Sequence, residues 1–140
     1  MLLKQISIFI ENRTGRLAEV TNIIAQNGID IRALAVADTA HFGILRIIVH
    51  DPYKVEQILK DNGLTFSLTS VVTVQVKDEP GGLASLLGVL TEHDISIEYM
   101  YAFLARNDNK AYVVMRIEED LKAQAILKEN GYIGIEAGKL

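Results

Sequence analysis

The sequence contains no cysteine, only two prolines, and no apolar run close to the ~18 residues that a membrane-spanning helix requires. Without cysteine the chain cannot form disulfides, thiolate nucleophiles or thiolate metal ligands. The opening stretch MLLKQISIFIE also lacks the basic region, apolar stretch and cleavage site of a secretion signal. We therefore expect a cytoplasmic protein that has no membrane partner.

Clusters of basic residues are missing as well. The net charge is −4, and no run of five or more basic residues occurs. Because phosphate backbones are bound by positive surfaces, we expect no nucleic acid partner. Apolar residues, in contrast, are plentiful: 49% of the 140 residues are hydrophobic and 23% are charged, which is enough for a packed core. The length fits one domain or two very small ones.

The chain consists of two repeats. The stretch NRTGRLAEVTNIIAQNGIDI (12–31) aligns with DEPGGLASLLGVLTEHDISI (78–97), and YKVEQILKDNG (53–63) aligns with LKAQAILKENG (121–131). In the first alignment the identical residues are Gly15, Leu17, Ala18, Ile29 and Ile31, which meet Gly81, Leu83, Ala84, Ile95 and Ile97. We therefore expect two domains, at residues 1–70 and 71–140.

In each repeat the spacing of apolar residues changes along the chain in the same order. The first strand alternates apolar and polar residues, as in 6–10, and the helix after it repeats apolar residues every three or four positions, as in 17–24. Second strands are expected at 29–38 and 95–105, third strands at 42–50 and 111–118, second helices at 52–63 and 121–131, and fourth strands at 64–70 and 132–137. This order predicts an α+β chain of two ferredoxin-like βαββαβ plaits in tandem, each an antiparallel sheet with both helices on one face.

The two second strands are unusually apolar. Along 29–37 and 95–104, apolar residues point to both faces of the sheet, whereas a sheet with one solvated face should alternate more clearly. We expect the helix-free faces to be covered by another copy of the chain, which makes the protein a homodimer. The alternative is that these are scattered surface residues without a partner.

Motifs for catalysis are absent from the sequence. There is no G-x-S-x-G elbow, and the PGG at 80–82 belongs to neither of the glycine-rich phosphate loops. His41, His50 and His93 have no spacing typical of metal ligands. We therefore expect no catalytic residue, no metal and no cofactor, and a protein that is not an enzyme.

The turn between the first strand and the first helix is the feature that remains, and it occurs twice. A helix N-terminus exposes unpaired N–H groups that suit a carboxylate, and glycine lets a ligand approach the backbone. The amide of Asn12 can both accept and donate hydrogen bonds, whereas ionised Asp78 can only accept. The alternative is that Asn12 and Asp78 are N-caps and that Gly15 and Gly81 avoid clashes between helix and strand.

Both turns, with the strand starts GIDI and DISI that follow, resemble the opening of the ACT domain, and the chain resembles a stand-alone protein of two tandem ACT domains. In that family amino acids bind at interfaces between adjacent ACT domains. The resemblance implies ligand-binding residues at Asn12, Arg13, Thr14, Gly15, Arg16, Leu17, Asp30 and Ile31 in the first repeat, and at Asp78, Glu79, Pro80, Gly81, Gly82, Leu83, Ser96 and Ile97 in the second.

The sequence departs from the family pattern in ways that make the two sites differ. Thr14 stands where proline usually precedes the glycine, and Asp78 stands where serine-responsive members have asparagine. Ile10 and Val76 occupy the positions of the ligand histidine of the family.

The resemblance implies a non-catalytic regulatory protein that senses a free amino acid or similar small molecule at ACT-domain interfaces. It would transmit occupancy to a partner enzyme or regulator of amino-acid metabolism. The alternative is a protein-interaction or oligomerisation module that has no small-molecule ligand. A third hypothesis is that the protein is a small enzyme with the plait fold, which would need a catalytic group that the sequence does not offer.

Overall fold

The computed structural model describes residues 1–104 and 109–135, and these form two compact units. The first unit contains residues 4–69. The second unit contains residues 1–3 together with the described residues from 70 onward. The domain boundaries expected from the repeats, 1–70 and 71–140, stay a prediction, but the repeats gave no sign that residues 1–3 belong with the second unit.

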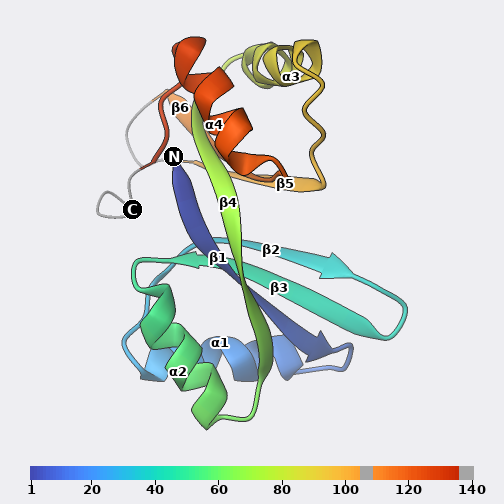
Figure 1. Ribbon diagram of the computed structural model, residues 1–140. Coiled ribbons are helices and arrows are strands. Elements are labelled where there is room, and N and C mark those ends of the chain that lie inside the picture. The colour runs from blue at the N-terminus through green and yellow to red at the C-terminus, as the bar shows by residue number, and fades with distance from the viewer. Residues whose placement is uncertain (105–108, 136–140) are drawn as a thin grey trace. The chain divides into compact units, whose positions relative to one another are not determined.

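The first unit has the expected βαββαβ order (Figure 1). Its elements are β1 (Leu2–Glu11), α1 (Arg16–Gln26), β2 (Ile31–Asp38), β3 (Phe42–Val49), α2 (Pro52–Asp61) and the first part of β4 (Thr65–Lys77). The strands lie in the order β2-β3-β1-β4. Helix α2 begins where the sequence predicts, because the Asp51 carboxylate accepts a hydrogen bond from the Lys54 amide at 3.1 Å.

One face of this sheet carries the core of the first unit. Ile6 and Ile8 of β1 lie opposite Ile47 and Leu45 of β3, and directly opposite residues of an antiparallel pair share a face. All four are fully buried. They pack with residues from both helices, namely Val20, Ile24, Val55 and Leu59. The alternation of β1 and the helical period of α1 and α2 therefore bring their apolar sides together, as the sequence predicts.

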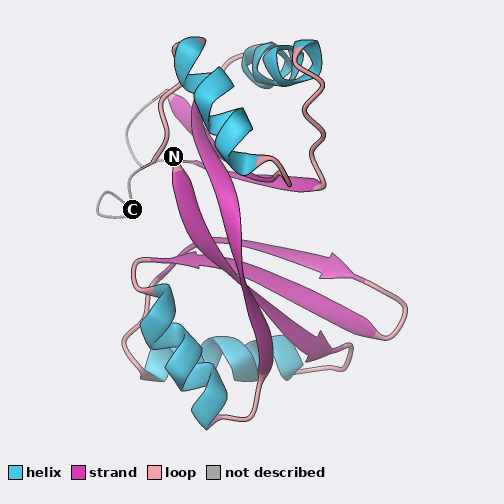
Figure 2. Cartoon of the chain, in the orientation of Figure 1, coloured by secondary structure: helices cyan, strands magenta, loops and turns pink. Residues whose placement is uncertain are grey.

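The second unit repeats this arrangement. Its elements, coloured as helices and strands in Figure 2, are the end of β4, α3 (Gly82–Glu92), β5 (Tyr99–Leu104), β6 (Lys110–Arg116) and α4 (Asp120–Glu129). The strand order is β4-β6-β5. Val72 and Val74 of β4 lie opposite Met115 and Val113 of β6. This face packs against Leu86, Leu90, Ala123, Ile126 and Leu127 from the two helices.

The strand predicted from residue 95 begins four positions later, at Tyr99. The chain first turns at Asp94, where φ is 55°, and the Ile95 amide donates to the Leu90 carbonyl at 2.9 Å. Ile95 thereby closes α3 instead of joining the sheet. Asp94 takes the left-handed conformation, which aspartate tolerates better than most residues, and Gly28 does the same after α1.

The fourth strand predicted at 132–137 is wrong for residues 132–135, which form no strand, while 136 and 137 lie outside the described residues. The free edge of β4 is shared between two segments instead. The amide and the hydroxyl of Thr73 both donate to the Met1 carbonyl at 2.8 Å, and the Gln75 amide donates to the Ile133 carbonyl at 2.8 Å. Residues 1–3 therefore occupy part of the place expected for the fourth strand.

A register shift between Ile31 and Ala33 changes which side of β2 faces the helices. After the shift Leu34 and Val36 lie opposite Ile47 and Leu45, so they are on the helix-covered side of the edge strand. They are nevertheless 54% and 49% exposed. The helix-free face carries Phe9 and Phe42, which are also exposed.

No helix within residues 1–104 and 109–135 is long and apolar enough to cross a membrane.

We predict that Gly134→Ala destabilises the second unit by about 1–3 kcal/mol, because overpacking a filled site has costs of this order. A Cβ added at Gly134 would lie 2.4 Å from the Met1 Cα. Gly88→Ala is the matched control: nothing lies within 4 Å of a Cβ there, and alanine in a helix gains about 1 kcal/mol over glycine. Urea unfolding followed by circular dichroism measures both, and equal stability of Gly134→Ala and the wild type would contradict the close packing.

Candidate functional site

The turn from β1 to α1 depends on one left-handed residue, Gly15, where φ is 84°. Gly15 is the N-cap of α1, and its carbonyl accepts the Glu19 amide at 3.0 Å. Gly81 has the same role before α3, with φ at 90°. The alternative in which Asn12 and Asp78 are N-caps is therefore wrong. Nothing lies within 4 Å of a Cβ added at Gly15 or Gly81, so these glycines serve the backbone conformation and do not avoid a clash.

Asn12 ties the first turn to the connection between β2 and β3. Its side-chain nitrogen donates to the Asp38 carboxylate at 3.0 Å, and its backbone amide donates to the His41 carbonyl at 3.4 Å. Asp78 keeps the backbone bond, to Asn109 at 3.1 Å. In the sequence of the second repeat the position of Asp38 is occupied by Leu104, so the carboxylate that accepts from Asn12 has no counterpart at that position. The two turns are therefore held differently.

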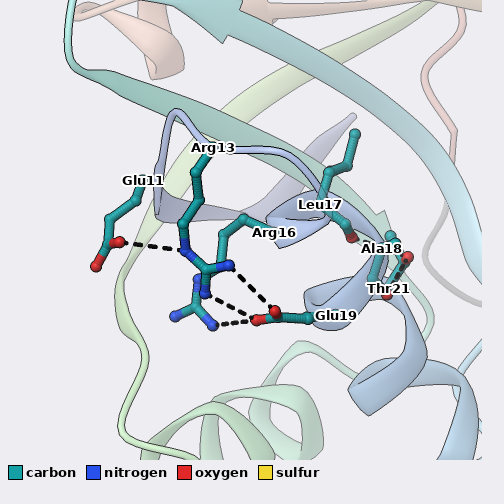
Figure 3. Close-up of polar contacts among 7 residues, drawn as sticks. All are labelled: Glu11, Arg13, Arg16, Leu17, Ala18, Glu19 and Thr21. Atoms are coloured by element: carbon teal, nitrogen blue, oxygen red, sulfur yellow. Dashed lines mark hydrogen bonds and ion pairs between the residues drawn. The ribbon is translucent and has the colours of Figure 1, made fainter.

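An ion-pair network covers the first turn (Figure 3). Arg13 contacts Glu11 through its Nε at 3.4 Å and donates to Glu19 at 3.2 Å, and Arg16 donates to Glu19 at 2.8 Å. These hydrogen bonds, from Arg16 first and then from Arg13, lower the pKa of the Glu19 carboxyl. The hydrogen bond to Glu19 raises the pKa of the Arg13 guanidinium.

In the second turn, other residue types stand at the positions that form this network in the first turn. Lys77 and Glu79 stand where Glu11 and Arg13 stand in the first repeat, with the signs reversed and the Lys77 Nζ 3.7 Å from Glu79. Gly82 and Ser85 stand in the places of Arg16 and Glu19. The Ser85 hydroxyl donates to the Gly81 carbonyl at 3.0 Å. The second turn therefore lacks the two long side chains that close the network in the first.

Each unit has a pocket beside its turn, at the corresponding place in the repeat. The first has a volume of about 380 Å³ and is lined by Phe9, Ile10, Glu11, Arg16, Phe42, Gly63, Leu64 and Thr65. The second has a volume of about 530 Å³ and is lined by Gln75, Val76, Lys77, Glu79, Pro80, Gly81, Gly82, Ser85, Lys110, Gly131, Tyr132 and Ile133. The same four segments of the repeat therefore form the pocket in both units: the end of the first strand, the start of the first helix, the start of the third strand and the segment after the second helix.

A family model described as an ACT domain pair matches residues 1–138. The chain belongs to the ACT domain pair family. Protein BT0572 from Bacteroides thetaiotaomicron has a similar crystal structure, with 43% sequence identity and a TM-score of 0.92, over 99% of this chain and 95% of that one.

Two further crystal structures share the fold of this ACT pair at low identity. The regulatory subunit of aspartate kinase from Thermus thermophilus is 15% identical, with a TM-score of 0.63 over 92% of this chain and 96% of that one. The aspartate kinase of Clostridium acetobutylicum is 12% identical, with a TM-score of 0.57 over 90% of this chain and 32% of that one. No curated protein sequence matches the chain.

The ACT pair brings together only some of the residues that the sequence proposed as ligand contacts. Arg16 lines the first pocket, and Glu79, Pro80, Gly81 and Gly82 line the second. Asn12, Arg13, Thr14, Gly15 and Asp78 belong to the turns without lining either pocket, and Leu17 and Leu83 are exposed on the first turns of their helices.

The predicted residues at the start of the second strands lie elsewhere in the ACT pair. Asp30 and Ile31 are at the start of β2, whereas Asn12 contacts Asp38 at its end, about 25 Å away along a strand of this length. Ser96 and Ile97 precede β5 in the same way. Within one unit, therefore, the two halves of the predicted site do not meet.

Sequence reasoning missed the wall that follows the second helix, residues 63–65 and 131–133. The repeated K-x-N-G of the ACT pair marked these segments as equivalent, but nothing in it pointed to a pocket. Among the described residues no group of three or more His, Asp or Glu side chains could hold a metal ion.

We predict that Gly81→Ala has a cost of about 1–2 kcal/mol, because alanine is strained at a positive φ. Gly81→Asn should have a smaller cost, since asparagine accepts this conformation more readily. Thermal unfolding compares the stability of the two variants. An equal loss of stability in both would show that the backbone angle is not its cause.

We also predict that Glu19→Gln lowers the melting temperature slightly at pH 7, through loss of the pairs with Arg13 and Arg16. The folded state lowers the pKa of Glu19 below its usual 4.5, so this contribution is present above that value and disappears as the pH falls through the folded value. The difference from the wild type should therefore close once the pH lies below the lowered pKa of Glu19. Glu92→Gln, at an exposed helix position, is the control that should change nothing.

Proposed function

We propose that this ACT pair is a non-catalytic regulatory protein that binds a free amino acid or similar small molecule and transmits its occupancy to a partner. The observation that carries the proposal is the pocket beside each glycine-capped turn. There, charged side chains of both signs lie close to the start of a helix, whose unpaired N–H groups favour a carboxylate. Such surroundings are complementary to the main-chain end of an amino acid.

The aspartate kinase structures support a regulatory role by their fold. In Thermus thermophilus the similar chain is a separate regulatory subunit of nearly the same extent. In Clostridium acetobutylicum the similar region is about a third of the chain of an allosteric enzyme. We propose that this ACT pair acts in the first manner, on a partner that carries the chemistry.

Transmission requires two arrangements of the protein that differ in their affinity for the ligand. A homodimer would supply them. Leu34 and Val36 support this, because both are about half exposed on β2, which ends the strand order and has one unpaired edge. A second copy that covers this edge would bury them, and a ligand whose affinity differs between two arrangements of the copies would favour one of them.

The second candidate function is an interaction module without a small-molecule ligand. The exposed Leu34, Val36, Phe9 and Phe42 favour it, since they would suit a protein partner whether or not the pockets are filled. The two functions differ in one observable property, which is the effect of free amino acids on stability.

We expect at least one of the twenty amino acids to raise the melting temperature of the full chain. A ligand at 100 times its dissociation constant adds about 2.7 kcal/mol to the stability of the folded state. The same melts with Arg16→Ala and Glu79→Ala, which change residues that line the pockets beside the two turns, test the site. If no amino acid shifts the melt, the sensor proposal fails and the interaction module remains. If the shift survives both substitutions, the turns are not the site.

A further inference from the structure

The two pockets lie at corresponding positions in the two repeats, but side chains of the protein fill the first pocket more than the second. In the first unit Arg16 lines the pocket, and Glu19 holds its guanidinium at 2.8 Å. In the second unit the corresponding residues are Gly82 and Ser85. The pocket there is larger, about 530 Å³ against about 380 Å³.

Glycine at position 82 is fixed by the backbone. A Cβ there would lie 2.3 Å from the Lys77 carbonyl oxygen, so the turn of the second unit passes too close to β4 for any side chain. The volume that Arg16 takes up in the first unit is thereby kept open in the second. Volumes of roughly 300–1,000 Å³ are typical of small-molecule sites.

The open pocket is also the more positive of the two. Lys77 and Lys110 lie directly opposite each other on β4 and β6, and like charges in this position destabilise a sheet. Glu79 is 3.7 Å from Lys77. Within residues 1–104 and 109–135, Lys110 has no ion pair. The lining therefore carries two positive charges and one negative charge, and an anion bound there would relieve the repulsion between the lysines.

The charges of the first pocket are already satisfied within its own turn. Glu11 and Arg16 line it, and each is paired, Glu11 with Arg13 and Arg16 with Glu19. A charged ligand would have to compete with these pairs. The duplicated site is thus closed by its own side chains in one copy and left open in the other.

We propose that the pocket of the second unit binds an acidic amino acid, aspartate or glutamate. This rests on the proposed function and names the ligand class of one of its two sites. The two carboxylates of the ligand match Lys77 and Lys110, and its ammonium group matches Glu79, so the charge of the ligand is opposite to that of the lining. Tyr132 and Ile133 offer apolar surface to its methylene groups.

Isothermal titration calorimetry of the full chain with L-glutamate, L-aspartate, L-glutamine and L-asparagine tests the ligand class. We expect one of the acidic amino acids to bind at least about tenfold more tightly than its neutral amide, since a charge-assisted hydrogen bond exceeds a neutral one by about this factor. Binding should weaken as sodium chloride is raised, because the Lys77 side chain is 80% exposed and its charge is screened. Equal or tighter binding of an amide would overturn the ligand class and leave the sensor proposal standing.

The position of the site is tested with Lys77→Gln and Lys110→Gln, separately and combined. The single substitutions should weaken glutamate or aspartate binding by up to about fivefold, the range for solvent-exposed charge pairs, and the double variant by more. Lys54→Gln removes the same charge at an exposed helix position that lines neither pocket, so it is the control and should leave the affinity unchanged. Melting temperatures confirm that each variant is folded.

Two outcomes would overturn the proposed position of the binding site. Unchanged affinity in the double variant would do so, and so would a loss in Lys54→Gln as large as that in the double variant. Either result still leaves an amino acid bound somewhere on the chain. Absence of binding by all twenty amino acids would instead remove the proposed function together with this inference.

Discussion

A positive φ angle at one glycine in each repeat is the constraint on which the candidate site depends. At Gly15 and Gly81 the chain leaves the first strand and enters the first helix within a few residues, and only a left-handed residue allows this turn. The glycine carbonyl then accepts the first helical amide, from Glu19 or from Ser85. As a result the end of a strand and the start of a helix meet at one wall of a pocket, whatever side chains surround them.

The two repeats show how much chemistry can change on one backbone. The φ angles of the two glycines differ by only a few degrees. The side chains around them differ more: at one pair of positions the charges are reversed, and at another pair the side chains are shorter in the second repeat. In the first unit the charges satisfy one another. In the second they face an open volume. The two copies therefore share the backbone of the turn and differ in the charges and the volume beside it.

The order of strands and helices could be predicted from the sequence, because hydrophobic period reports directly which side of an element is buried. The departures come from contacts that no local pattern encodes. Met1 takes a place on the edge of β4, the bulge after Ile31 switches the faces of β2, and Asp94 delays β5. The repeat located the turns of the candidate site in the same way. Its other wall and the bond between Asn12 and Asp38 arise from tertiary packing between distant segments, which spacing along the chain does not reveal.

The placement of Met1 also bears on how the protein folds and how it can be divided. Met1 and Thr73 are 72 positions apart, so the bond between them closes a loop that contains the whole first unit. Loop-closure entropy opposes such a contact until the intervening chain is compact, which makes the first unit the natural one to form early. A fragment cut at the repeat boundary would leave Thr73 without its acceptor. The sequence divides into two similar halves, but the compact second unit includes residues 1–3 from the other end of the chain.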